Sequence, residues 1–131
     1  MDIFILQKKS LTDLKSPIQR NAYCTAAVTL GELIDEMVAR NAQKKPSAPD
    51  YLSIFDGLTE AGETRYAYES RKAKYTVSEM QEFARQAFDD KIYLVKNVTS
   101  GVQYASLDEP LNLNSGDEIA FIKLKYVRGF I

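Results

Sequence analysis

The chain contains no histidine, no tryptophan and a single cysteine, Cys24. Without histidine it cannot build the Ser-His or Cys-His pair that activates many hydrolytic nucleophiles. Zinc sites of the four-cysteine and Cys/His types are excluded by the same composition, and one thiol cannot close an internal disulfide. Ordinary hydrolase chemistry is therefore disfavoured, and we expect no enzyme activity and no cofactor or metal site.

Glycine-rich motifs and long apolar runs are also lacking. The six glycines form neither a phosphate-binding loop nor a dinucleotide-binding fingerprint. The apolar run near the N-terminus covers only residues 3–6, too few for a signal peptide core or a membrane span. A net charge of -1, from 17 basic and 18 acidic residues, gives no overall attraction to nucleic acid or anionic lipid. These absences favour a cytoplasmic protein without membrane association.

What is present is typical of one globular domain, which we expect to span residues 1–131. The chain is 45% hydrophobic and 27% charged, an ordinary balance for a protein that buries a core.

Two amphipathic helices are the clearest local prediction. Thr29 with Glu32, and Thr76 with Glu79, form capping boxes that open a helix. The first helix should end near residue 41 or 42, and the second at Asp89-Asp90. Apolar side chains then recur at helical spacing on one face of each helix: Leu30, Leu33, Ile34, Met37 and Val38 in the first, and Val77, Met80, Phe83, Ala84, Ala87 and Phe88 in the second.

Short apolar or alternating runs predict strands between these helices. A hairpin is expected between residues 53–55 and 64–68, residues 11–21 read as a connection, and 97–101 as a turn. The strands are predicted at 3–6, 22–28, 51–55, 92–95, 102–105 and 118–127.

The last strand is the most apolar. Ile119 and Phe121 fall on one face and Ala120 and Ile122 on the other, so both faces should be covered. The sequence therefore predicts an α+β fold with one mixed sheet, whose first and last strands lie side by side at the centre and whose helices cover one face.

The stretch Gly116-Asp117-Glu118-Ile119-Ala120-Phe121-Ile122 resembles the closing strand of β-grasp, ubiquitin-like proteins, especially the small sulfur carriers of molybdopterin and thiamine synthesis. The resemblance implies that the first and last strands pair in parallel, that the helix at 29–42 crosses them, and that residues 50–90 are an insertion carrying an extra hairpin and helix. The carriers end in a free Gly-Gly carboxylate, whereas this chain ends Arg128-Gly129-Phe130-Ile131. Sulfur carriage would therefore require trimming after Gly129.

Few residues are candidates for chemistry. Cys24 lies in an apolar run, which favours an inert core thiol over a reactive thiolate. The carboxylate pairs 89–90, 108–109 and 117–118 flank turns, so capping and solvation explain them better than metal binding does.

The stretch 65–75 mixes basic and aromatic side chains: Arg65, Tyr66, Tyr68, Arg71, Lys72, Lys74 and Tyr75. Such a stretch can contact nucleic acid, but the negative charge of Glu69 weakens its electrostatic attraction to phosphate, and tyrosines favour protein contacts. Phe130 and Ile131 at the C-terminus are a second expected anchor.

We therefore expect a non-enzymatic protein-interaction or accessory module with an unidentified protein partner, and self-association stays open. One alternative is a sulfur carrier matured by C-terminal trimming. Another is a small enzyme or ligand-binding protein that uses carboxylates, tyrosines or Cys24, which a deep pocket lined by several of these groups would favour.

Overall fold

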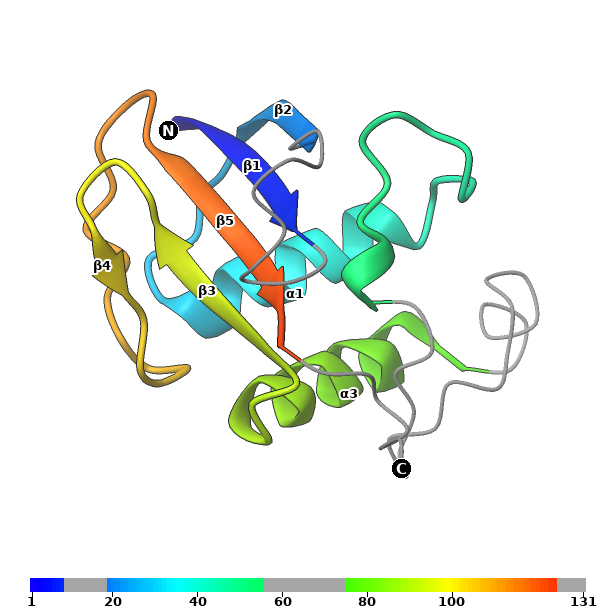
Figure 1. Cartoon of the computed structure of the whole chain (residues 1–131). Coiled ribbons are helices and arrows are strands. Elements are labelled where there is room, and N and C mark those ends of the chain that lie inside the picture. The colour runs from blue at the N-terminus through cyan, green and yellow to red at the C-terminus, as the bar shows by residue number, and fades with distance from the viewer. Residues whose placement is uncertain (9–18, 56–74, 125–131) are drawn as a thin grey trace.

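The computed structural model of the chain describes residues 1–8, 19–55 and 75–124 (Figure 1). In chain order its elements are β1 (Asp2–Lys8), β2 (Gln19–Cys24), α1 (Leu30–Asn41), the short 3-10 helix η1 (Ser53–Phe55), α3 (Val77–Asp89), β3 (Tyr93–Asn97), β4 (Val102–Gln103) and β5 (Glu118–Lys123).

The described strands form one mixed sheet in the order β2-β1-β5-β3-β4. β1 and β5 lie side by side and run parallel, with Ile5 beside Ile119, whereas the other neighbouring pairs are antiparallel. The α+β class and the central placement of the first and last strands, both predicted from the sequence, are confirmed.

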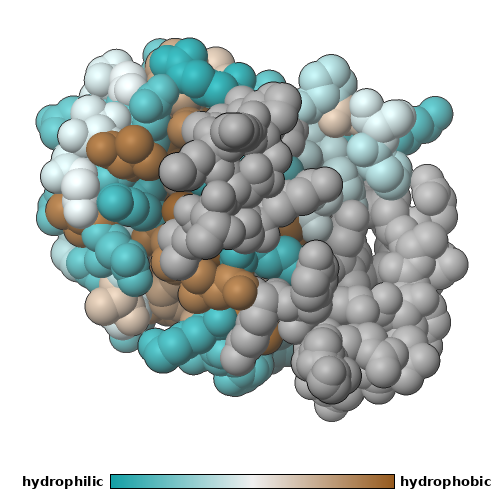
Figure 2. Space-filling view, viewed as in Figure 1, coloured by the Kyte–Doolittle hydropathy of each residue, from teal (hydrophilic) through white to brown (hydrophobic). Residues whose placement is uncertain are grey.

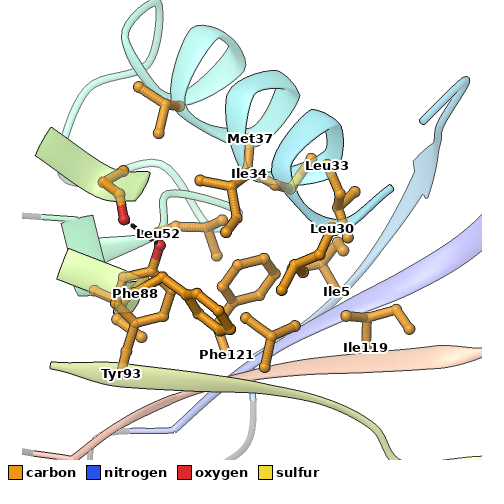
Figure 3. Close-up of a cluster of buried hydrophobic side chains, with 14 of the residues drawn as sticks. Ile5, Leu30, Leu33, Ile34, Met37, Leu52, Phe88, Tyr93, Ile119 and Phe121 are labelled. Atoms are coloured by element: carbon orange, nitrogen blue, oxygen red, sulfur yellow. Dashed lines mark hydrogen bonds between the residues drawn. The ribbon is translucent and has the colours of Figure 1, made fainter. Parts of the chain in front are cut away.

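Both helices pack on the same face of the sheet, as predicted (Figure 1). Alternate residues of the strands point toward them, and Figure 3 shows these side chains meeting the apolar faces of α1 and α3. Phe55 packs edge-to-face on Tyr93 and on Phe121, with ring centroids 5.8 and 5.9 Å apart. The largest fully buried hydrophobic side chains of this core are Tyr93, Phe121, Ile3, Ile5, Leu30, Leu33, Ile34, Met37, Ile119 and Val95.

The opposite face of the sheet is apolar at its centre, and Figure 2 shows hydrophobic residues on that side of the molecule. Leu6, Ala120 and Ile122 are nearly removed from solvent and pack with the partly buried Phe4 and Leu94. β5 is therefore buried on both faces, as its continuous apolar run predicted.

α1 begins and ends as predicted. Both hydrogen bonds of its capping box form, and Ala42 is the C-cap. Its first free amides are also satisfied by a later loop, because the N–H groups of Leu30 and Gly31 donate to the carbonyls of Glu109 and Leu107 at 3.0 and 2.8 Å. The loop approaches so closely that a Cβ at Gly31 would lie 3.2 Å from the Leu107 oxygen.

α3 also begins at its predicted capping box, and Asp90 is its C-cap. The end is a Schellman motif, in which the N–H of Ile92 donates to the carbonyl of Ala87 and that of Lys91 to Phe88. Lys91 occupies the left-handed position with φ 61°, a conformation that glycine adopts without strain.

The prediction for the second strand was wrong in its bounds. β2 covers 19–24 instead of 22–28, so the polar Arg20 and Asn21 pair with Leu6 and Ile5. An edge strand has a neighbouring strand on one side only, so more of it is exposed to solvent and polar residues are tolerated in it.

A second correction concerns residues 51–55, which were predicted as a strand but contain η1. The amide N–H of Leu52 donates to Oδ1 of Asn41, and Nδ2 of Asn41 donates back to the Leu52 carbonyl. This backbone is thus bonded to a side chain of α1 instead of a neighbouring strand. The predicted hairpin between 53–55 and 64–68 lies largely outside the described residues.

Candidate functional site

The two halves of α3 differ in burial. In its C-terminal half Ala84, Ala87 and Phe88 are buried in the core. In its N-terminal half Val77 is 40% exposed, and Met80 and Phe83 are only partly buried. The sequence predicted one apolar stripe along this helix, and the structure buries only the C-terminal half of that stripe fully.

Contacts with β3 and α1 account for that difference. The Tyr93 hydroxyl donates to the Ala84 carbonyl at 2.7 Å, and the Phe88 ring lies 6.0 Å from that of Tyr93. On the side of α1, Arg85 pairs with the carboxylate of Asp35, and Nε2 of Gln81 donates to the Asp35 carbonyl at 3.0 Å. The described contacts with β3 and α1 therefore hold α3 from its second turn onward, while most side chains of its first turn are exposed to solvent.

An aromatic residue before the helix extends the exposed half of this stripe. The Tyr75 ring packs edge-to-face on Phe83, with centroids 4.9 Å apart and an interplanar angle of 86°. Tyr75, Val77, Met80 and Phe83 together form what we call the α3 surface cluster.

Tyr75 is the only described residue of the predicted interaction stretch 65–75. The structure therefore places the end of that stretch on the first turns of α3. The remaining predicted interaction residues lie outside the described residues: Arg65, Tyr66, Tyr68, Arg71, Lys72, Lys74, Phe130 and Ile131.

Cys24 is exposed, so its predicted place in the core was wrong. Side chains alternate along β2, and Tyr23 points toward α1 while Cys24 points to the opposite face. Both described helices pack on the Tyr23 face, so no described helix covers the Cys24 side chain.

Two of the carboxylates near turns bind backbone amides of those turns. The buried Asp117 accepts hydrogen bonds from Nδ2 of Asn97 and from the Asn114 amide, both at 2.9 Å. Glu109 accepts the Ala105 amide at 2.6 Å. Within residues 1–8, 19–55 and 75–124, no three acidic or cysteine side chains gather in a way that could hold a metal ion.

A small hollow beside the end of α3 gathers two tyrosines and a carboxylate. It measures about 120 Å³ and is lined in part by Asp89, Tyr93 and Tyr104, whereas ligand pockets usually span about 300–1,000 Å³. Both tyrosine hydroxyls donate to backbone carbonyls, that of Tyr104 to Leu111 at 2.9 Å. Burial raises the pKa of both phenols, so these side chains serve the fold as neutral donors.

A polar cluster that the sequence did not indicate fastens β2 to α1. Glu36 accepts hydrogen bonds from the Tyr23 hydroxyl at 3.1 Å, the Thr25 hydroxyl at 2.5 Å and the Ala26 amide at 3.2 Å. Burial, together with the Glu36 carboxylate, raises the pKa of Tyr23 to about 12. The cluster joins Glu36 to residues at least ten positions away in the sequence, so no local motif predicts it.

Among the described residues, every helix is too short or too polar to span a lipid bilayer. Comparisons of the chain with protein-family models, with curated proteins and with solved structures gave no match. Its function is therefore inferred from its own residues and contacts.

Proposed function

We propose that the chain is a non-enzymatic protein-interaction module of β-grasp type, which binds a protein partner through the α3 surface cluster and the basic stretch before it. One observation carries the proposal. Val77, Met80 and Phe83 continue the apolar stripe that forms the core, yet they remain partly exposed on the first turns of α3.

The chemistry of this surface suits a protein ligand. Tyrosine, phenylalanine and methionine are enriched in interfaces, where they supply contact area at low conformational cost. Tyr75 is held against Phe83, so part of this surface is already ordered before a partner binds.

The charge of the adjoining stretch indicates the kind of partner. Residues 65–74 carry four basic side chains, Arg65, Arg71, Lys72 and Lys74, against one acidic side chain, Glu69. A complementary partner presents apolar side chains flanked by acidic ones.

The fold supports the β-grasp part of the proposal. β1 and β5 pair in parallel at the sheet centre, and α1 packs across them. The stretch that carries the resemblance forms the turn before β5 and part of the core. Asp117 accepts a hydrogen bond within that turn, Gly116 has φ 86°, and Phe121 is fully buried. α3 then belongs to the proposed insertion, and the proposed interaction surface lies on that insertion.

Site-specific crosslinking in the native cell tests the proposal. Val77 is replaced by the photoreactive amino acid p-benzoylphenylalanine, and Val28, which is 65% exposed, serves as the matched control position. We expect position 77 to give one discrete adduct with another protein and position 28 to give none. Absence of an adduct at position 77, or the same adduct from both positions, would contradict the proposed surface.

The basic stretch is tested by charge reversal in the same experiment. The double variant Arg71→Glu, Lys72→Glu should reduce the adduct yield several-fold, and Lys72→Arg, which keeps the charge, should not. An unchanged yield in the reversed variant would remove the basic stretch from the interface.

The C-terminus separates this proposal from a sulfur carrier. We propose that Phe130 and Ile131 remain on the mature chain as a second apolar anchor. Intact-mass spectrometry of the native protein should therefore show both residues. Loss of the two residues, leaving Gly129 as the terminal carboxylate, would favour the carrier instead.

A further inference from the structure

The two edges of the sheet are unequal. β4 has only the two residues Val102 and Gln103, and such brevity limits pairing with another strand. β2, at the other edge, has six residues and no proline.

The hydrogen bonding of β2 shows which of its backbone groups face outward. Met1 and Thr25 exchange both backbone hydrogen bonds, at 2.9 and 3.2 Å. In an antiparallel pair the bonded positions recur every second residue, so Tyr23 and Asn21 point their backbone groups at β1.

The backbone groups of Arg20, Ala22 and Cys24 therefore point away from β1. Among the described residues, no backbone partner pairs with these groups. β2 thus presents alternating N–H and C=O groups along a free edge, the arrangement to which another strand adds.

The side chains of β2 leave that edge open. Arg20 lies back over its own sheet, with its guanidinium 3.7 Å from the centroid of the Phe4 ring and its Nε 2.6 Å from Glu118. Tyr23 is fixed to Glu36 on the helix side. Ala22 and Cys24 are exposed and small, so they lack the bulk and charge that commonly protect an edge strand.

We propose that the free edge of β2 pairs antiparallel with β2 of a second copy of this chain, about a two-fold axis at Ala22. Ala22 then faces Ala22 of the other copy, and Arg20 faces Cys24 in both directions. This register engages all three outward-facing residues in about six hydrogen bonds, two for each facing pair, and joins the two sheets into one.

Charge and symmetry favour a second copy over a foreign peptide. An antiparallel pair about a two-fold axis is self-complementary, so the second copy presents the matching edge without further adaptation. Arg20 is the only charged residue of β2, and the proposed register sets it against an uncharged side chain. No like charges face each other directly, and each Arg20 keeps its Glu118 partner.

Analytical ultracentrifugation of the full chain tests the inference. The native chain should change from one copy to two as its concentration rises through the micromolar range. Ala22→Lys and Ala22→Glu each set like charges face to face and should weaken the dimer about tenfold or more. An equimolar mixture of the two variants should restore dimers, since opposite charges then meet.

Val102→Lys and Val102→Glu at the β4 edge are the matched controls and should leave dimerisation unchanged. Far-UV circular dichroism confirms that each variant is folded. A native chain that stays monomeric at all concentrations overturns the proposal, as do Ala22 variants that dimerise like the native chain or Val102 variants that are equally impaired. The α3 surface proposal stands apart, because its crosslinking test does not depend on Ala22.

Discussion

α1 and α3 begin with the same local motif but differ in what they bury. In both, a threonine N-cap and a glutamate three residues later exchange hydrogen bonds with the backbone. The apolar stripe of α1 is buried along its length, whereas that of α3 is buried only in its second half. The local sequence at a helix start therefore determines where the helix begins, while contacts from distant segments determine which of its residues join the core.

Those distant contacts can be named. The first amides of α1 donate to backbone carbonyls of the loop at Leu107 and Glu109, so that end of the helix is held by the loop. The first turn of α3 has its own capping box, and Tyr75 packs on Phe83 in the next turn. A helix with one anchored end and one half-exposed apolar end can offer the latter to a partner.

The largest expected effect compares two phenylalanines of α3. Phe88→Ala should lower the free energy of unfolding by about 3–5 kcal/mol, because it leaves a cavity in the core. Phe83→Ala should cost less than about half of that, since its ring is already partly in water. Urea denaturation measures both, and equal losses would mean that the two halves of α3 are equally packed.

A similar contrast is expected between the helices. Leu33→Ala in α1 should cost about 3 kcal/mol, because the side chain is fully buried. Val77→Ala in α3 should stay within about 0.5 kcal/mol, because that side chain is exposed and alanine favours the helix. A large loss at Val77 would place it in the core and remove it from the proposed surface.

The two capping threonines should contribute equally to stability, whereas the apolar stripes of the two helices should contribute unequally. Thr29→Ala and Thr76→Ala each remove one bond to a backbone amide and should cost about 1 kcal/mol. Thermal unfolding of the two variants gives the comparison. A cost confined to one helix would show that the cap depends on its tertiary setting.

The smallest expected effect is a gain. Lys91→Gly should stabilise the chain by about 0.5–1 kcal/mol, since glycine adopts the positive φ at the end of α3 without strain. Gln43→Gly, at the corresponding position after α1, serves as the control and should give no gain, because its φ is not positive. A stabilised Gln43→Gly, or a destabilised Lys91→Gly, would contradict this reading of the helix ends.

Local patterns predicted much of the fold. Both capping boxes, the helix end at Ala42 and the paired central strands follow from signals within a few residues, and the structure has them. The failures all involve partners distant in sequence. Leu52 bonds to Asn41 instead of a strand, and Cys24 is exposed because it points to the sheet face opposite the two helices.

The candidate site was only partly predictable for the same reason. Basic and aromatic composition indicated the stretch ending at Tyr75, but no sequence signal separates Phe83 from Phe88. Their burial depends on where β3 and α1 contact α3. A stripe of even hydrophobicity cannot reveal which part of it the rest of the chain will cover.

The proposed α3 surface can be tested by measuring the affinity of the crosslinked partner for the purified chain. Val77→Asp introduces an acidic residue into the α3 surface cluster, and it should preserve the helix because acidic residues suit a first turn. By isothermal titration calorimetry, Val77→Asp should weaken binding about tenfold or more, and the control Val28→Asp should leave it within about twofold. Equal affinities of the two variants would contradict the claim that the first turns of α3 bind the partner.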